Sequence, residues 1–275
     1  MFPNRTSPNR AFPDRWKRSG ITFLLLFSST SPIANSAPQI PSAIPPARTQ
    51  VFASQNRNAG CKILYLGVVG GTETSGNPYS GVVQIRKILQ GPAYSDVCVR
   101  SVTPYFWRSG LHWILGHFPS HPGKLTPEES AASPKVILVG HSLGGWGVLS
   151  VARNLNHKGI PVALSVQIDS VGITDRTVPP NVKAAVNFHA DDALFLLTTK
   201  TTHAEDSTQT KLVQNVFVKN AGHWSVTRDP RIKDLVLCTV GSLRSGHEPT
   251  PDCTLPSQPD HAHTPPAEGS SPGLK

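Results

Sequence analysis

Short apolar runs alternate with amphipathic segments along most of this chain. The runs are rich in β-branched residues and are bounded by glycine, proline or polar positions, as buried strands are. They cover Ile63–Val69, Val97–Val102, Val136–Val139, Val162–Ile168, Ala184–Phe188 and Leu212–Val218. Six strands that alternate with helices predict an α/β fold, with a mostly parallel sheet flanked by helices.

Three segments have the apolar spacing of amphipathic helices. Ser80 precedes the first and Gly91 ends it, while Asp229 and Pro230 form an N-cap and N1 pair at the start of the third. Their apolar positions are Val82, Ile85 and Ile88 or Leu89; Val148, Val151, Ala152 and Leu155; and Ile232, Leu235, Val236 and Val240. The stretch 105–135 is interpreted as a long connection that carries aromatic residues and prolines.

The two ends of the chain lack these patterns. Residues 1–36 resemble a secretory signal peptide, with five basic residues, an apolar core at Ile21–Phe27 and small residues at Ala34–Ser36. The alternative is a basic leader with no role in export. Residues 37–60 are interpreted as a disordered linker and residues 246–275 as a disordered Pro-rich tail, which leaves 61–245 as the folded domain.

The net charge of the chain is modest once the leader is set aside. The formal charge is +9, but residues 1–36 hold five Lys/Arg and one Asp, so the remainder carries +5. No Lys/Arg run or basic stripe follows, so nucleic-acid binding is not expected.

Four cysteines in a chain with a predicted signal peptide suggest disulfides, and three pairings are available. Cys61 precedes the first predicted strand and Cys98 lies early in the second, so parallel neighbours would bring them to the same end of the sheet. Cys238 and Cys253 are close in sequence and would tie the tail to the last helix. We therefore favour 61–98 with 238–253, against free buried thiols. No C-x-x-C pattern suggests a zinc site.

The sequence Gly140–Gly144 matches G-x-S-x-G with Ser142 at its centre. A predicted strand leads into it and a predicted helix follows, which is the context that presents a serine nucleophile above a sheet. Gly140 and Gly144 lack side chains, so the helix can pack close to the end of the strand. A Gly/Ser turn gives the same motif by chance, but the flanking elements favour the nucleophile.

By this motif, by the chain order Ser, Asp, His and by the strand pattern, residues 62–243 resemble an α/β-hydrolase of the lipase/esterase type. The resemblance implies Ser142 as the nucleophile. It implies His223 as the base, because this histidine lies in a glycine-containing loop between the last strand and the last helix. The acid is open: Asp169 follows the fourth strand, as in pancreatic-type lipases, whereas many other members would place it after the next strand, at Asp191 or Asp192.

The resemblance also implies an oxyanion hole formed by two backbone N–H groups. Leu143 is expected to supply one, and Val68, in the Gly67–Gly71 turn after the first strand, the other. G-x-G-x-x-G is absent, so no dinucleotide site is expected, and neither a cofactor nor a metal is expected.

Any segment that covers the substrate must lie outside the place where many α/β-hydrolases carry a helical cap domain. Only about fourteen residues separate Asp169 from the next predicted strand, too few for a large helical cap domain. The aromatic segment Tyr105–Phe118 is the best candidate for that cover, with ordinary core packing as the alternative.

These features lead us to expect a secreted or periplasmic serine hydrolase that cleaves carboxylic esters through an acyl-enzyme. The alternatives are a thioesterase or serine peptidase on the same triad, or a non-catalytic binding protein that keeps the fold. The expected partner is a small-molecule or lipid ester, with peripheral contact with lipid surfaces compatible with that role, and the chain is expected to be a monomer.

Overall fold

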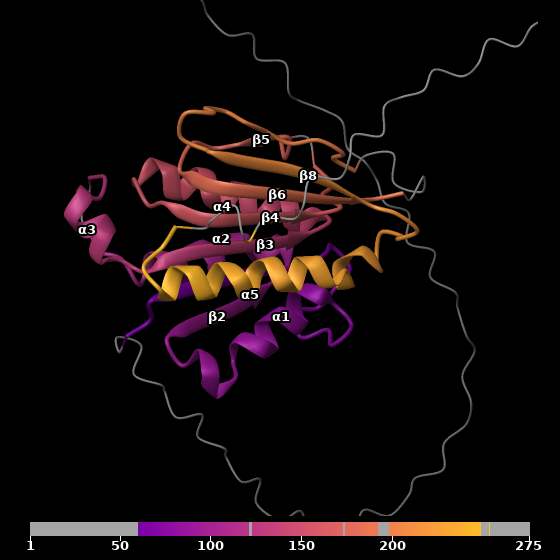
Figure 1. The fold of residues 1–275 in the computed structure, drawn as a ribbon, viewed down its shortest axis with the longest axis horizontal. Coiled ribbons are helices and arrows are strands. Elements are labelled where there is room, and N and C mark those ends of the chain that lie inside the picture. Colours follow the sequence, from indigo (N-terminus) through magenta and orange to yellow (C-terminus); the bar gives the residue numbers. More distant parts are fainter. Residues whose placement is uncertain (1–59, 121–122, 173, 192–197, 249–252, 254–275) are drawn as a thin grey trace, which may run out of the picture. The chain divides into compact units, whose positions relative to one another are not determined.

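The six predicted strands form one parallel sheet in the computed structural model (Figure 1), in the order β2-β1-β3-β4-β6-β8. The strands are β1 (Ile63–Val68), β2 (Val97–Val102), β3 (Lys135–His141), β4 (Val162–Ile168), β6 (Val182–Ala190) and β8 (Leu212–Val218). The structure describes residues 60–120, 123–172, 174–191, 198–248 and 253, which all belong to the same compact unit. The predicted fold class is confirmed: an α/β fold without a large cap among these residues.

The central strands are buried along their full lengths, as expected for a parallel sheet covered on both faces. Alternate residues of β1 enter two different cores. Ile63 and Tyr65 pack in one apolar cluster, and Leu64, Leu66 and Val68 pack in the other. Because both faces of the strand are buried in apolar clusters, every position of β1 is apolar and the strand forms a continuous apolar run in the sequence.

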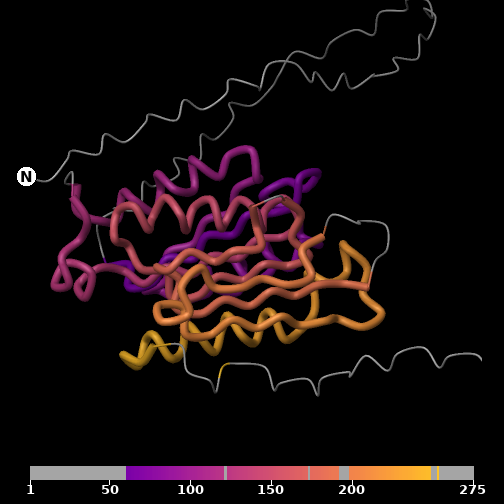
Figure 2. The backbone as a smooth tube through the Cα atoms, turned by 90° about the horizontal axis from the view of Figure 1, so that it is seen from above, coloured from indigo at the N-terminus to yellow at the C-terminus, as the bar shows by residue number. Residues whose placement is uncertain are grey.

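Two helices pack on each face of the sheet. α1 (Gly81–Leu89) and α5 (Pro230–Arg244) contribute to the first cluster, and α2 (Trp107–Leu115) and α4 (Leu143–His157) to the second. Figure 2 shows the yellow C-terminal helix on one side of the strands and the magenta helical segments on the other. In α1 the buried alternative is Leu89, while Ile88 is exposed.

The remaining elements were not among the six predicted strands and three predicted helices, although a packed helix was the alternative for the aromatic segment Tyr105–Phe118. Residues 105–135 contain α2 and a short helix α3 (Pro127–Ala132), which begins with a capping box between Thr126 and Glu129. A two-strand ladder pairs β5 (Thr177–Val178) with β7 (His203–Ala204). Three 3-10 turns complete the description: η1 (Pro92–Tyr94), η2 (Pro104–Phe106) and η3 (Val226–Arg228). The position of Ser80 as N-cap is confirmed, but its side chain makes no capping hydrogen bond.

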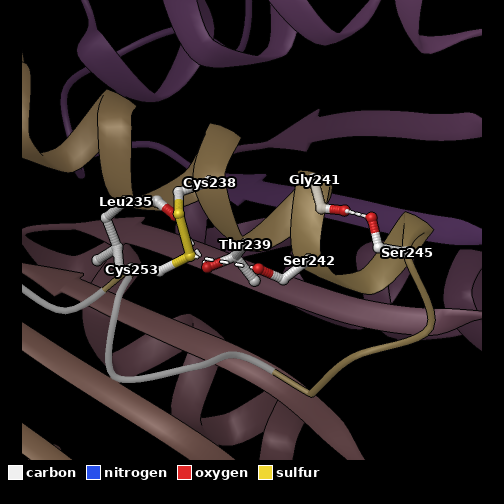
Figure 3. Close-up of a disulfide and its surroundings, with 7 residues drawn as sticks. All are labelled: Leu235, Cys238, Thr239, Gly241, Ser242, Ser245 and Cys253. Atoms are coloured by element: carbon white, nitrogen blue, oxygen red, sulfur yellow. Dashed lines mark hydrogen bonds between the residues drawn. A yellow bond between two sulfur atoms is a disulfide. The ribbon is translucent and has the colours of Figure 1, made fainter.

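Both favoured disulfides, Cys61–Cys98 and Cys238–Cys253, are present. The first joins the start of β1 to β2, where the parallel register places Leu64 beside Cys98. The second joins α5 to Cys253 (Figure 3), whose Sγ lies 3.4 Å from the Ser242 hydroxyl. Two disulfides are typical of proteins that fold in an oxidising compartment.

We expect the Cys61–Cys98 disulfide to stabilise the fold more than the Cys238–Cys253 disulfide does. The two bridges close loops of 37 and 15 residues, which correspond to roughly 4 and 3 kcal/mol in the chain-entropy model. Denaturant unfolding of the C61A/C98A and C238A/C253A double variants measures the two losses. A larger loss from C238A/C253A would contradict this order.

An ion pair between Asp96 and Arg244 ties the end of α5 to the residue before β2. The Arg244 Nε lies 2.9 Å from Asp96 Oδ1, and the guanidinium also donates to the Ala93 carbonyl. Hydrogen bonds from Arg244 hold the pKa of Asp96 below its usual value of 3.8. The pair therefore stabilises the fold above the unfolded-state pKa and loses its effect as the pH falls through the lowered one.

We expect Asp96→Asn to lower the free energy of unfolding at pH 7 by about 1 kcal/mol or less. The difference from wild type should shrink progressively below about pH 5. Urea unfolding at several pH values measures it, with Asp234→Asn at an exposed position as the control. A difference that grows on acidification would contradict the assignment.

Candidate active site

The residues singled out in the sequence meet at the carboxyl edge of the sheet. Ser142 lies between β3 and α4, Asp169 follows β4, and His223 lies in the loop between β8 and η3. The turn at Ser142 is joined to the turn at Asp169 by two backbone hydrogen bonds. Ser142 N–H donates to the Ile168 carbonyl at 3.0 Å, and Val171 N–H donates to the Ser142 carbonyl at 3.1 Å.

The Ser142 turn has the strained geometry that the motif predicts. Ser142 is the N-cap residue of α4, with φ 55° and ψ −127°. Helix α4 packs so closely on the sheet that a Cβ at Gly140 would lie 2.2 Å from the Gly144 carbonyl oxygen. A Cβ at Gly144 would lie 2.1 Å from the Val68 carbonyl oxygen. Only glycine fits at both positions, so the motif is a packing requirement of this turn.

Asp169 and His223 form a buried hydrogen-bonded pair. His223 Nδ1 lies 2.6 Å from Asp169 Oδ2, and both side chains are almost fully buried. Asp169 Oδ1 accepts a second hydrogen bond, from the Ala190 N–H at 3.1 Å. A carboxylate at Nδ1 selects the tautomer with a proton on that nitrogen, so Nε2 is the ring nitrogen that can accept a proton from a nucleophile.

Left-handed backbone conformations are concentrated at this edge. Among the described residues, the non-glycine positions with positive φ are Ser142, Asp169 and Asn220, at 55°, 43° and 60°. Two of them are members of the candidate triad, and Asn220 lies three residues before His223. Such conformations cost roughly 1–3 kcal/mol each and are typical of functional sites.

The structure distinguishes the candidate acids by position. Asp169 is fully buried and bonded to His223, whereas Asp191 is exposed at the end of β6. Asp192 lies outside the described residues. Nearby, burial lowers the pKa of His189, which is partly offset by the charge of Asp169, so this histidine is expected to be neutral at neutral pH.

The two expected oxyanion donors lie in different settings. Leu143 is the first residue of α4, where backbone N–H groups have no partner within the helix and favour negative charge. Val68 is the last residue of β1, in register with Val102 and Gly140. The Val69 amide donates to the Val102 carbonyl of β2, so the Val68 amide faces β3 by strand alternation. The assignment of Val68 stays a prediction.

A buried Glu–His pair contacts the candidate triad. The sequence analysis did not identify it. Glu73, in the loop after β1, and His141, the last residue of β3, are 2.5 Å apart, and His141 also contacts the His223 carbonyl. A second missed acid is Asp175, which is fully buried and accepts hydrogen bonds from Ser170 and Thr199. The sequence signal for Glu73 was slight: one acidic residue close to a glycine-rich turn.

Exposed aromatic residues surround the same edge. Tyr105 and Phe106 are exposed by 71% and 66%, and Tyr79 and Trp224 are also exposed. The later part of the proposed cover segment differs in burial from Tyr105 and Phe106. Four of its apolar residues belong to the core: Trp107, Leu111, Ile114 and Phe118. For these four, the core-packing alternative holds.

A small cleft of about 200 Å³ opens between the loop after β1 and the His223 loop, with Tyr79, Glu73 and Trp224 among its walls. A larger cavity of about 800 Å³ lies at the other edge, near the amino ends of β3, β4 and β6. We associate the small cleft with the site, because Trp224, one of its walls, is adjacent to His223 in the chain.

Within the described ranges, no group of three or more His, Cys, Asp or Glu side chains is placed to hold a metal ion. No helix in that part of the chain is both long and apolar enough to cross a membrane.

Comparisons with known proteins show likeness in structure alone. No protein-family model matches the chain, and no curated protein matches it. One similar solved structure is TT1662 from Thermus thermophilus, with 12% identity, 64% of this chain and 87% of that chain covered, and a TM-score of 0.34. Another is RedJ with a polyethylene glycol molecule bound in its active site, with 12% identity, 76% and 96% covered, and a TM-score of 0.36.

Proposed function

We propose that this protein is an exported serine hydrolase that cleaves carboxylic esters. The observation that carries the proposal is the buried Asp169–His223 hydrogen bond at the sheet edge where Ser142 occupies a strained strand–helix turn. The chain order Ser, Asp, His and the parallel sheet support the same assignment. A binding protein would not need this combination of a strained serine and a buried acid–histidine pair.

In the proposed reaction, Ser142 Oγ attacks the ester carbonyl while His223 Nε2 takes the hydroxyl proton. Asp169 orients the imidazole and stabilises its positive charge. The Leu143 amide stabilises the oxyanion. His223 then donates the proton to the alcohol oxygen as the ester C–O bond breaks. The alcohol departs, and the acyl group remains bonded to Ser142 Oγ as the acyl-enzyme. A water molecule, deprotonated by His223, releases the acid and restores the serine.

The exposed aromatic residues favour an apolar acyl or lipid ester as the substrate. Tyr105 and Phe106 follow β2, and a Cβ at Gly71 would lie 2.8 Å from Leu143 Cδ1 and 3.5 Å from the Tyr105 hydroxyl. Tyr105 thus lies beside the start of α4. An apolar rim of this kind suits an acyl chain or the surface of a lipid aggregate.

Labelling with a fluorophosphonate probe tests the proposal, since the probe reacts covalently with an activated serine. Wild-type protein is expected to be labelled, whereas S142A is not. Turnover of matched p-nitrophenyl esters, thioesters and anilides then separates an esterase from a thioesterase or peptidase. An unlabelled wild-type protein would favour the non-catalytic alternative.

Export is a separate part of the proposal, supported by the two disulfides. Residues 1–36 lie outside the described residues. If they are a signal peptide, the mature protein is expected to begin near Ala37. N-terminal sequencing of the protein from culture medium or periplasm measures this start. An intact Met1 in that material would contradict the signal-peptide assignment.

A further inference from the structure

The Glu73–His141 pair lies outside the candidate triad but is bonded to it through main chain. His141 Nδ1 is 2.5 Å from Glu73 Oε1, and His141 Nε2 is 2.8 Å from the carbonyl oxygen of His223. The side chain of His141 is fully buried and that of Glu73 is nearly so. Burial of such a pair costs desolvation free energy. A pair buried beside the candidate triad therefore indicates a specific structural or functional role.

The contacts of His141 define the role of its Nε2 nitrogen. A carbonyl oxygen only accepts, so Nε2 must donate to His223. Glu73 Oε1 also accepts from the Gly70 N–H at 3.3 Å. Burial would raise the pKa of Glu73, but the hydrogen bond and charge of His141 hold it below its usual value. His141 Nδ1 forms the other short hydrogen bond, with Glu73 Oε1, so both ring nitrogens of His141 have a partner and the ring is held from two sides.

The ring packing fixes this arrangement further. The centroids of the His141 and His223 rings are 4.8 Å apart, and the Trp224 ring lies 5.7 Å from His141 and 5.3 Å from His223. The pair therefore joins three segments: the loop after β1, the residue that precedes Ser142, and the loop that carries His223.

We propose that Glu73 and His141 are positioning residues that hold the His223 main chain at a set distance from Ser142. The inference rests on the proposed hydrolase function. Asp169 controls the orientation of the His223 ring, whereas His141 controls the position of the loop on which the ring is mounted. His141 is adjacent to Ser142 in the chain, so one imidazole ring links the nucleophile turn directly to the base loop.

Two isosteric variants of His141 separate its two hydrogen bonds. In H141Q, the Gln Nε2 occupies the place of His Nε2 and can still donate to the His223 carbonyl. In H141N, the Asn Nδ2 replaces His Nδ1 and can still donate to Glu73, but the bond to His223 is lost. E73Q, alone and combined with H141Q, removes the buried carboxylate charge that H141Q would leave unpaired.

The expected result is a split between kcat and KM on a soluble p-nitrophenyl ester. H141N should lower kcat roughly 10–100-fold, because small displacements of a catalytic group have effects of that size, while KM changes less than about twofold. The E73Q/H141Q variant should retain more kcat than H141N. H157Q, at the exposed end of α4, is the matched control and should behave as wild type.

Equal losses of kcat in H141N and E73Q/H141Q, or wild-type kcat in both, would overturn the proposal. Activity in S142A would instead overturn the hydrolase function, so the two failures are distinguishable.

Proton NMR supplies a readout that does not depend on activity or on the function. Short hydrogen bonds from imidazole to carboxylate shift the Nδ1 proton far downfield. Two such signals are expected, from His141 and His223. E73Q should remove the first, and D169N the second. H141N should remove the first and also shift the second, because the His223 loop moves. An unshifted His223 signal in folded H141N would overturn the positioning role.

Discussion

Replacement of Ser142 by alanine is expected to reduce ester hydrolysis by about 10⁶-fold in kcat. The substitution removes the only atom of this residue that can form the acyl bond, while the backbone that holds the turn is unchanged. Ser142 N–H and C=O both remain bonded to the neighbouring turn. Serine and alanine both adopt a positive φ with difficulty, so the substitution adds no new backbone strain. The variant should therefore fold with wild-type stability.

The measurement is turnover of a p-nitrophenyl ester at saturating substrate, with circular dichroism and denaturant unfolding as controls for folding. S150A, within α4, is a matched serine variant that should keep its activity; the Ser150 hydroxyl bonds only to the Trp146 carbonyl among the contacts described. Wild-type turnover in S142A would exclude the serine mechanism.

The second large effect is expected from Asp169→Asn, about 10⁴-fold in kcat. Asn Oδ1 can still accept from the Ala190 N–H, so the turn is expected to keep its shape. Its amide N–H₂ would face His223 Nδ1, which favours the tautomer with the proton on Nε2. That tautomer cannot take the proton of Ser142, so the geometry remains and the base is lost.

Asp191→Asn supplies the control, because this exposed residue should contribute little to kcat. Asp192→Asn is tested beside it, with the same small effect expected. If either of these substitutions abolished turnover while D169N stayed near wild type, the resemblance to pancreatic-type lipases at Asp169 would be misleading.

The hydrophobic pattern was sufficient for the sheet because its inner strands are buried almost continuously and the edge strands β2 and β8 keep apolar positions. β1, β3 and β4 are apolar along almost their whole lengths, and the turns between them are marked by glycine, serine and proline. The aromatic segment before β3 was harder to interpret. Its nine-residue helix α2 follows a 3-10 turn directly and has no capping side chain, so the usual start signal is missing.

Ser142 and His223 were predictable as candidates from local context. Gly140 and Gly144 are required by steric contacts within the motif itself, and His223 lies in the loop before a well-marked helix start at Asp229–Pro230. The choice between Asp169 and Asp191 could not be made in this way. Both follow predicted strands, and the difference is that only Asp169 has a buried carboxylate bonded to His223.

The sequence by itself thus determined the parallel sheet, the serine turn, the histidine loop and the favoured disulfide pairing, since each depends on residues close in the chain or on strand order. Tertiary structure alone decided the partner of His223 and the Glu73–His141 contact, which join residues 54 and 68 positions apart. The β5–β7 ladder belongs to the same group, because two-residue strands carry no periodicity. Such contacts depend on how strand ends and loops meet in space, which local hydrophobic patterns do not specify.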